Sequence, residues 1–184
     1  MDCHNAAVLL TFHFALGSDD EVRAIVALVE SAYRGPASRA GWTTEADLLE
    51  GQRTDEGAVV VMTESPASLV LLAFANDVLV GCCHLARYDA ATAAFGLFAV
   101  RPDCQGAGRG RSLLEEAERT ARGRFSAQVL RMTVIRQRED LLAWYARRGY
   151  VPTGETEPFP YGNEAFGTPL RDDLEFVVLE KPLT

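Results

Sequence analysis

Apolar residues recur along the chain with the periods of helices and of strands, and this alternation predicts a mixed fold. Between residues 20 and 33, apolar side chains return on one face of a helix. Further helices are expected at residues 45–50, 111–123 and 139–148, the last one stopped by Gly149. Short apolar runs between turn residues predict strands at residues 8–16, 68–75, 78–88, 93–100, 129–135 and 175–180. The run at 59–62 is too short to separate a strand from a buried helix.

The expected order of elements is therefore β-α-α-βββ-α-β-α-β. The connections at residues 76–77 and 89–92 are short and polar, so the three central strands should form an antiparallel meander. One β-α-β unit follows the meander. This order predicts an α/β (α+β) layered fold. No repeat, linker or low-complexity tract divides the 184 residues, so we expect a single domain over residues 1–184.

Residues 152–174 contain no periodic pattern and are expected to form a long loop. Four prolines and three glycines in this stretch exclude a continuous helix. Such long loops often act as lids or binding surfaces, and the alternative is a passive surface excursion. The aromatic residues Phe159, Tyr161 and Phe166 favour a binding role, because aromatic side chains need a surface to pack on.

The charges are unevenly distributed over the sequence. The chain has 18 basic and 26 acidic residues, a formal net charge of −8, and 48% hydrophobic residues, which is typical of a globular protein. Residues 101–148 nevertheless hold 11 basic and 6 acidic side chains. This basic section suggests a site for a polyanion between acidic flanks, and the alternative is a set of solvated helix faces. The overall negative charge argues against nucleic acid as a partner.

The four cysteines favour packing over metal binding. Cys3, Cys82, Cys83 and Cys104 form no C-x-x-C pair and the chain has three histidines, so no metal site is expected. The first residues lack the basic segment of a signal peptide, and no apolar run has the length of a membrane span. We therefore expect a cytoplasmic protein in a reducing compartment, without a membrane partner.

A glycine-rich turn at residues 105–110 lies between the strand at 93–100 and the helix at 111–123. Free backbone N–H groups and the positive end of the helix dipole make such a turn a binding site for phosphate. A Walker A loop is excluded because no lysine follows Gly110. A dinucleotide fingerprint is excluded because the glycines are spaced G-x-G-x-G.

The sequence Gln105-Gly-Ala-Gly-Arg-Gly fits the pattern Q/R-x-x-G-x-G/A, which is the acetyl-CoA pyrophosphate loop of the GNAT superfamily of N-acetyltransferases. Downstream, residues 138–150 resemble the family helix that ends in a tyrosine and a Gly-aromatic pair. The two motifs cover residues 95–151. The resemblance implies a GNAT-like, mostly antiparallel mixed sheet with helices on both faces.

The resemblance also implies roles for individual residues. The cosubstrate would be acetyl-CoA, without a metal, and its pantetheine and diphosphate would contact Phe98, Ala99, Val100, Gln105, Gly106, Ala107, Gly108, Arg109, Gly110 and Arg111. Tyr145 falls on the position of the family's general acid. A tyrosine hydroxyl has a pKa of about 10 and stays protonated near neutral pH, as a proton donor must. The alternative for Tyr145 is a purely structural place in the core.

Two features depart from the family pattern. Arg138 stands where the family often has an asparagine that contacts CoA, and it is suited to a phosphate or to the acceptor. The strand at 93–100 contains no carboxylate that would serve as a general base. Other candidates for the base are His84, Glu64, Glu157 or a water relay.

The resemblance implies transfer of an acetyl group to a primary amine of a small molecule, an amino acid or a peptide. The residues expected to bind this acceptor are Arg34, Trp42, His84, Glu157 and Tyr161. Because the flanks are acidic, we expect a cationic amine to be attracted to the site. A homodimer would be consistent with the family. The alternative function is a non-catalytic acyl-CoA-binding sensor or interaction module.

Overall fold

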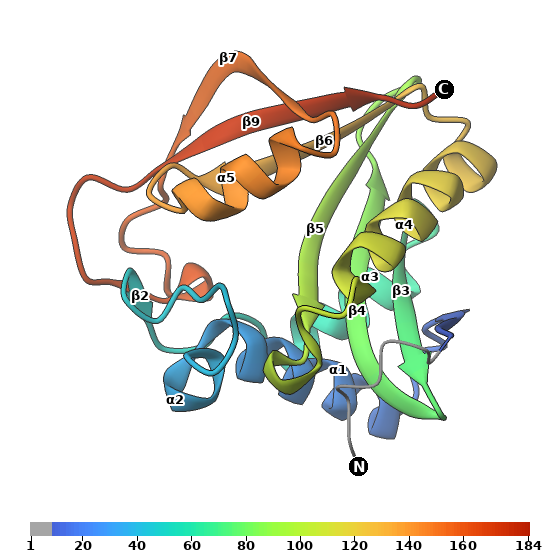
Figure 1. Cartoon of the computed structure of the whole chain (residues 1–184), viewed down its shortest axis with the longest axis horizontal. Helices are drawn as coiled ribbons and strands as arrows, with labels where there is room; N and C mark the ends of the chain where they lie inside the picture. The colour runs from blue at the N-terminus through green and yellow to red at the C-terminus, as the bar shows by residue number, and fades with distance from the viewer. Residues whose placement is uncertain (1–8) are drawn as a thin grey trace.

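The computed structural model describes residues 9–184, which form a central sheet of seven strands (Figure 1). The strand order is β1-β3-β4-β5-β6-β9-β7, and all neighbours are antiparallel except β5 and β6. The strands are β1 Thr11–Phe14, β3 Ser68–Ala75, β4 Val78–Arg87, β5 Thr92–Val100, β6 Val129–Ile135, β7 Val151–Pro158 and β9 Glu175–Pro182. A separate ribbon pairs β2 Leu49–Glu50 with β8 Thr168–Pro169.

Helices cover both faces of the sheet, as the resemblance implied. The helices are α1 Asp19–Tyr33, α2 Gly35–Ser38, α3 Glu56–Glu64, α4 Arg109–Phe125 and α5 Glu139–Ala146. The buried faces of α1 and α3 pack on one face of the sheet, and those of α4 and α5 pack on the other. The expected α/β class with a mostly antiparallel sheet is therefore confirmed.

The elements with strong periodicity agree with the sequence prediction. The meander of β3, β4 and β5 is present with its short connections. Gly149 ends the last helix at a φ of +88°, a backbone conformation that glycine adopts without strain. The ambiguous residues 59–62 belong to α3, which begins after Asp55, whose side chain accepts a hydrogen bond from the Ala58 N–H group.

Three predictions about local structure were wrong. Residues 45–50 form a turn followed by β2, and the short helix of this connector is α2, which has Pro36 in its first turn. Residues 151–158 form the edge strand β7, where a proline is tolerated because one side of the strand has no ladder partner. The first strand is shorter than predicted, and the predicted start at residue 8 lies outside the described residues.

The parallel pair β5 and β6 opens a wedge in the sheet. The two strands pair only between Thr92–Ala94 and Val129–Arg131, and they diverge beyond these residues (Figure 1). In the diverging part, the register between β4 and β5 shifts, and Leu97 has a φ of +47°. A residue other than glycine rarely adopts this conformation, and such strain gathers at functional sites.

Cys82 and Cys83 are buried free thiols, and burial raises the pKa of both. Within residues 9–184, no helix has both the length and the apolar character needed to cross a membrane. The same part of the chain brings together no three His, Cys, Asp or Glu side chains that would hold a metal ion.

Candidate active site

Two cavities lie where β5 and β6 diverge. The larger has a volume of about 420 Å³ and the smaller about 210 Å³. They share five residues, so they meet along one wall. The shared residues are Tyr33, Phe98, Arg138, Leu141 and Tyr145.

The glycine-rich turn lines the smaller cavity with main-chain groups. Gly106 and Gly108 have φ angles of +88° and +78°, which glycine adopts without a steric penalty. The backbone N–H groups of residues 106, 107, 108, 110 and 111 donate to no other described residue. Because α4 begins at Arg109, its positive dipole end adds to these donors. The turn is therefore a cradle for an anion such as a diphosphate.

Two arginines add positive charge at the smaller cavity. Arg111 is exposed and pairs with Glu115 at 2.7 Å. Arg148 lies over the Trp144 ring, with its guanidinium carbon 3.5 Å from the ring centre. Burial, followed by the nearby Arg147 and Arg111, lowers the pKa of Arg148. Arg148 was not among the residues predicted from the sequence, although it lies directly before the Gly149-Tyr150 pair of the family motif.

Two residues of the predicted diphosphate loop, Ala107 and Arg109, line neither cavity. The side chain of Arg109 is buried and donates to the Cys104 carbonyl at 3.1 Å. Gln105 lines the smaller cavity, and its side chain joins two segments. It accepts from the Trp42 N–H group at 2.9 Å and donates to the Val100 carbonyl at 3.0 Å.

Tyr145 stands at the junction of the two cavities. Only 4% of the residue is exposed, and its ring packs against the rings of Phe98, Trp144 and Tyr150. Burial raises the pKa of its hydroxyl well above the ordinary value. The hydroxyl makes no hydrogen bond with the rest of the described chain. Tyr145 is therefore a protonated group that both cavities reach.

The larger cavity contains a buried carboxylate among three arginines. Glu45, with 6% of its side chain exposed, pairs with Arg34 at 2.7 Å and with Arg138 at 2.8 Å. The Nε atom of Arg53 lies 3.9 Å from the same carboxylate. Burial alone would raise the pKa of Glu45, but the three arginines together hold it below its usual value. Glu45 is therefore ionised, and the cluster has a surplus of positive charge.

The sequence matches the family model of the acetyltransferase (GNAT) family over residues 24–150. The chain belongs to the GNAT family. The matched residues include the glycine-rich turn, the wedge between β5 and β6, and Tyr145. GNAT proteins are acyltransferases that use an acyl-CoA as cosubstrate, and the chain is assigned to this class. No curated protein matches the sequence.

Solved structures of GNAT proteins share the fold. The ribosomal-protein-S18-alanine N-acetyltransferase from Escherichia coli is 15% identical with a TM-score of 0.68, covering 96% of this chain and 95% of that one. An N-acetyltransferase from Staphylococcus aureus Mu50 is 11% identical with a TM-score of 0.69, covering 95% and 98%. A GNAT family acetyltransferase from Elizabethkingia anophelis with acetyl-CoA bound is 17% identical with a TM-score of 0.58, covering 95% and 98%. At these identities the likeness concerns the fold alone.

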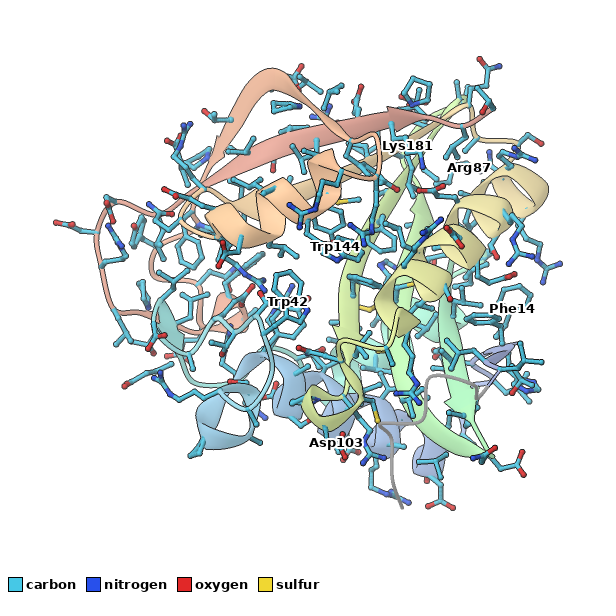
Figure 2. All side chains as sticks on the ribbon, in the orientation of Figure 1. Phe14, Trp42, Arg87, Asp103, Trp144 and Lys181 are labelled. Atoms are coloured by element: carbon cyan, nitrogen blue, oxygen red, sulfur yellow. The ribbon has the colours of Figure 1, made fainter. Side chains whose placement is uncertain are left out.

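The residues expected to bind the acceptor fall in different places of this GNAT fold. Arg34 and Glu157 line the larger cavity. Trp42 lines the smaller one. Its ring centre lies 6.4 Å from that of Trp144, and Figure 2 shows the two side chains next to each other. His84 lies on β4 outside both cavities, and burial lowers its pKa.

The long loop contributes aromatic residues to the larger cavity, but Tyr161 is not one of them. Its ring packs on Phe159, and its hydroxyl accepts from the Leu174 N–H group at 2.7 Å. Tyr161 therefore holds the loop in place. Phe159 and Phe166 line the cavity itself.

The charge of the larger cavity differs from the prediction. Of the many acidic residues in the flanks, Glu45 and Glu157 are the two that line it, and three arginines line it as well. Glu157 is also 3.8 Å from Arg131. The expected concentration of negative charge around the acceptor is therefore absent from the described lining.

Replacing Glu45 with glutamine should destabilise the fold. Removing one partner of a buried ion pair costs about 3–5 kcal/mol, and the amide oxygen that remains recovers part of it, so we expect a loss of about 2–3 kcal/mol in the free energy of unfolding. Urea denaturation at neutral pH measures this loss. Asp47→Asn is the matched control, because exposed Asp47 pairs with Arg39 and such pairs contribute about 0–1 kcal/mol. Equal losses in the two variants would contradict the role given to Glu45.

Proposed function

We propose that the protein is an N-acetyltransferase that moves an acetyl group from acetyl-CoA to a primary amine, by direct attack, with Tyr145 as the general acid. The observation that carries the proposal is the position of Tyr145 on the wall shared by the two cavities. One cavity has the anion cradle that a coenzyme requires, and the other has room for a small acceptor. A proton donor at their junction is in the place where a leaving thiolate would form.

The smaller cavity fits acetyl-CoA in three respects. The N–H groups of the glycine-rich turn suit the diphosphate, and Arg111 and Arg148 suit its charge. The residues of β5 from Phe98 to Val100 have no partner in β6. Their Phe98 and Val100 carbonyls accept from Tyr33 and Gln105, so the pantetheine arm would pair with the main-chain groups that remain. The structure from Elizabethkingia anophelis contains acetyl-CoA within the same fold, which supports this cosubstrate.

The reaction balances with a single proton donor. Acetyl-CoA supplies an activated acyl carbon, and the neutral amine nitrogen forms a bond to this carbon while the carbon–sulfur bond breaks. The electron pair of that bond stays on sulfur, and the Tyr145 hydroxyl gives the sulfur a proton. The amine loses a proton to water, and the tyrosine regains its own from solvent. The products are an N-acetyl amide and free CoA thiol.

The strained part of β5 supports the proposed chemistry. Leu97 and Phe98 have no partner in β4, because the register between β4 and β5 shifts there. The Phe98 carbonyl accepts a hydrogen bond from the Tyr33 hydroxyl at 2.8 Å. The carbonyl is therefore fixed in direction. We infer that N–H groups of β5 between this bulge and Val100 polarise the thioester carbonyl.

The central sheet extends beyond the part of the chain that matches the family model. The family match ends at residue 150 and begins at residue 24, whereas β1 precedes it and β7 and β9 follow it. All three strands lie in the same sheet as β5 and β6. This continuity supports one acyl-CoA N-acyltransferase domain over residues 1–184.

Thiol release tests the function directly. Acetyl-CoA alone should release little CoA thiol, and addition of an accepted amine should increase the rate and give the N-acetyl product by mass spectrometry. Binding of acetyl-CoA without release for any amine in a broad library would instead indicate an acyl-CoA sensor.

The ratio kcat/KM for the acceptor should not fall as the pH is raised to about 10. Burial raises the pKa of Tyr145 above its ordinary value of 10.0, so the hydroxyl keeps its proton up to at least about pH 10. The ratio kcat/KM should therefore rise as the acceptor amine loses its proton, and then level off. Initial rates of thiol release across the pH range give the profile. A decline beginning near pH 8 would show that an acid with a lower pKa donates the proton.

A further inference from the structure

The larger cavity contains more positive charge than the protein itself neutralises. Three guanidinium groups surround the single carboxylate of Glu45, at 2.7, 2.8 and 3.9 Å. The other acidic residue of the cavity, Glu157, is associated with Arg131. The connector between α2 and β2 lies below α5 in Figure 1. Glu45 belongs to this connector, and Arg138, directly before α5, pairs with it.

Several donors of this cluster have no acceptor in the described chain. Arg34 is 7% exposed, and its Nε and Nη2 atoms are buried without a hydrogen-bond partner, as is the Nε atom of Arg138. Buried charged donors without acceptors are costly, so an acceptor is expected to be supplied from outside the protein. An anion in the cavity would supply the compensating charge.

Arg53 is the member of the cluster that is best placed to bind such an anion. Its guanidinium makes no hydrogen bond to the described residues, and 28% of its side chain is exposed. The guanidinium group stacks over Tyr33, with its carbon 5.2 Å from the ring centre. In this position the N–H groups at its edge are available to bind an anion. The main chain beneath it is fixed, because Glu30 accepts from the N–H groups of Arg53 and Thr54 at 2.6 and 3.0 Å.

The remaining wall of the larger cavity is mostly apolar. It includes side chains from β5, β6, β9 and the long loop, among them Phe95, Met132, Ile135, Phe159 and Phe176. A ligand of this cavity should therefore have an apolar body besides its charged groups. A polyamine fits poorly, since a second ammonium group would meet the arginine surplus.

We propose that the acceptor is an amine with an apolar body and a carboxylate or similar anionic oxygen group, and that Arg53, with Arg34 and Arg138, binds this anionic group. The inference rests on the proposed function for the identity of the ligand as the acceptor. The amine would lie toward Tyr145, and the anion would lie toward Glu45 and its arginines. Arg53 is thus a specificity-determining residue that binds the part of the acceptor that does not react.

Binding of matched probes tests the anion site without catalysis. The probes 3-phenylpropionate and 2-phenylethylamine have the same body and differ in the charged group. Calorimetry in the presence of CoA should show tighter binding of the carboxylate. Arg53→Gln should weaken that binding at least 10-fold, whereas Arg136→Gln should leave it unchanged, because Arg136 is paired with Glu175 and lines neither of the two cavities. Equal or tighter binding of 2-phenylethylamine would overturn the inference.

Turnover then separates this inference from the proposed function. L-phenylalanine should be a better acceptor than L-phenylalaninamide, and Arg53→Gln should raise KM for the acid at least 10-fold with little effect on the amide. If amides or polyamines are acetylated more efficiently than acids, the inference fails while the transferase function stands. If 3-phenylpropionate binds through Arg53 but acetyl-CoA neither binds nor releases thiol, the anion site stands and the transferase function fails.

Discussion

Replacing Tyr145 with phenylalanine should lower kcat for acetyl transfer by about 100-fold or more, with KM for acetyl-CoA changing less than about 2-fold. A positioned proton donor contributes about 10²–10⁴ to a rate, and the variant removes the hydroxyl alone. The ring and its contacts with Phe98, Trp144 and Tyr150 are retained. Steady-state thiol release with both substrates varied measures the two constants separately.

Tyr150→Phe provides the matched control for this experiment. Tyr150 is also buried and packs on Tyr145, but its hydroxyl donates to Glu118 at 3.0 Å and it lines neither of the two cavities. We expect kcat to stay within about 3-fold of the wild type, with some loss of stability from the lost hydrogen bond to Glu118, which keeps its ion pair with Lys181. Similar kcat values for wild type and Tyr145→Phe would remove Tyr145 from the mechanism and leave it as a core residue.

Local patterns indicated the parts of the candidate site that lie close together in sequence. The glycine-rich turn follows β5 and precedes α4 within a short segment, so residues 105–110 alone predicted a main-chain cradle suited to a phosphate. The meander was predictable because its strands are strongly apolar and joined by short turns. Tyr145 became a candidate through its match to the family motif, since its apolar neighbours alone favour a place in the core.

Long-range contacts explain what could not be predicted. Glu45 meets Arg138, which is 93 residues away, and no local pattern marks either residue as a partner of the other. Net charge counted along the acidic flanks therefore predicted a negative acceptor site, whereas the fold brings arginines from three segments to one carboxylate. The strand β7 was missed for a related reason. Its prolines argue against a strand, and only its pairing with β9 at the sheet edge makes them acceptable.

Replacing Gly108 with valine should weaken acetyl-CoA binding far more than it changes the chemical step. Gly108 has a φ of +78°, which a β-branched residue adopts only with strain, and an added Cβ meets no protein atom within 4 Å. The new side chain would therefore enter open space at the cradle, where it competes with the diphosphate. Loss of two charge-assisted hydrogen bonds corresponds to about 3 kcal/mol or more, so KM for acetyl-CoA should rise by about 100-fold or more.

Gly123→Ala is the control for the Gly108 variant. Gly123 lies inside α4, the helix that Gly108 precedes, and an alanine there meets no atom within 4 Å and no unfavourable φ. Alanine is the better helix former, so this change should leave KM unaltered and raise stability slightly. Calorimetric titration of both variants with CoA separates binding from catalysis. If Gly108→Val binds CoA as tightly as Gly123→Ala, the diphosphate does not lie on this turn, and the basic surface formed by Arg111 and Arg148 would have to hold it alone.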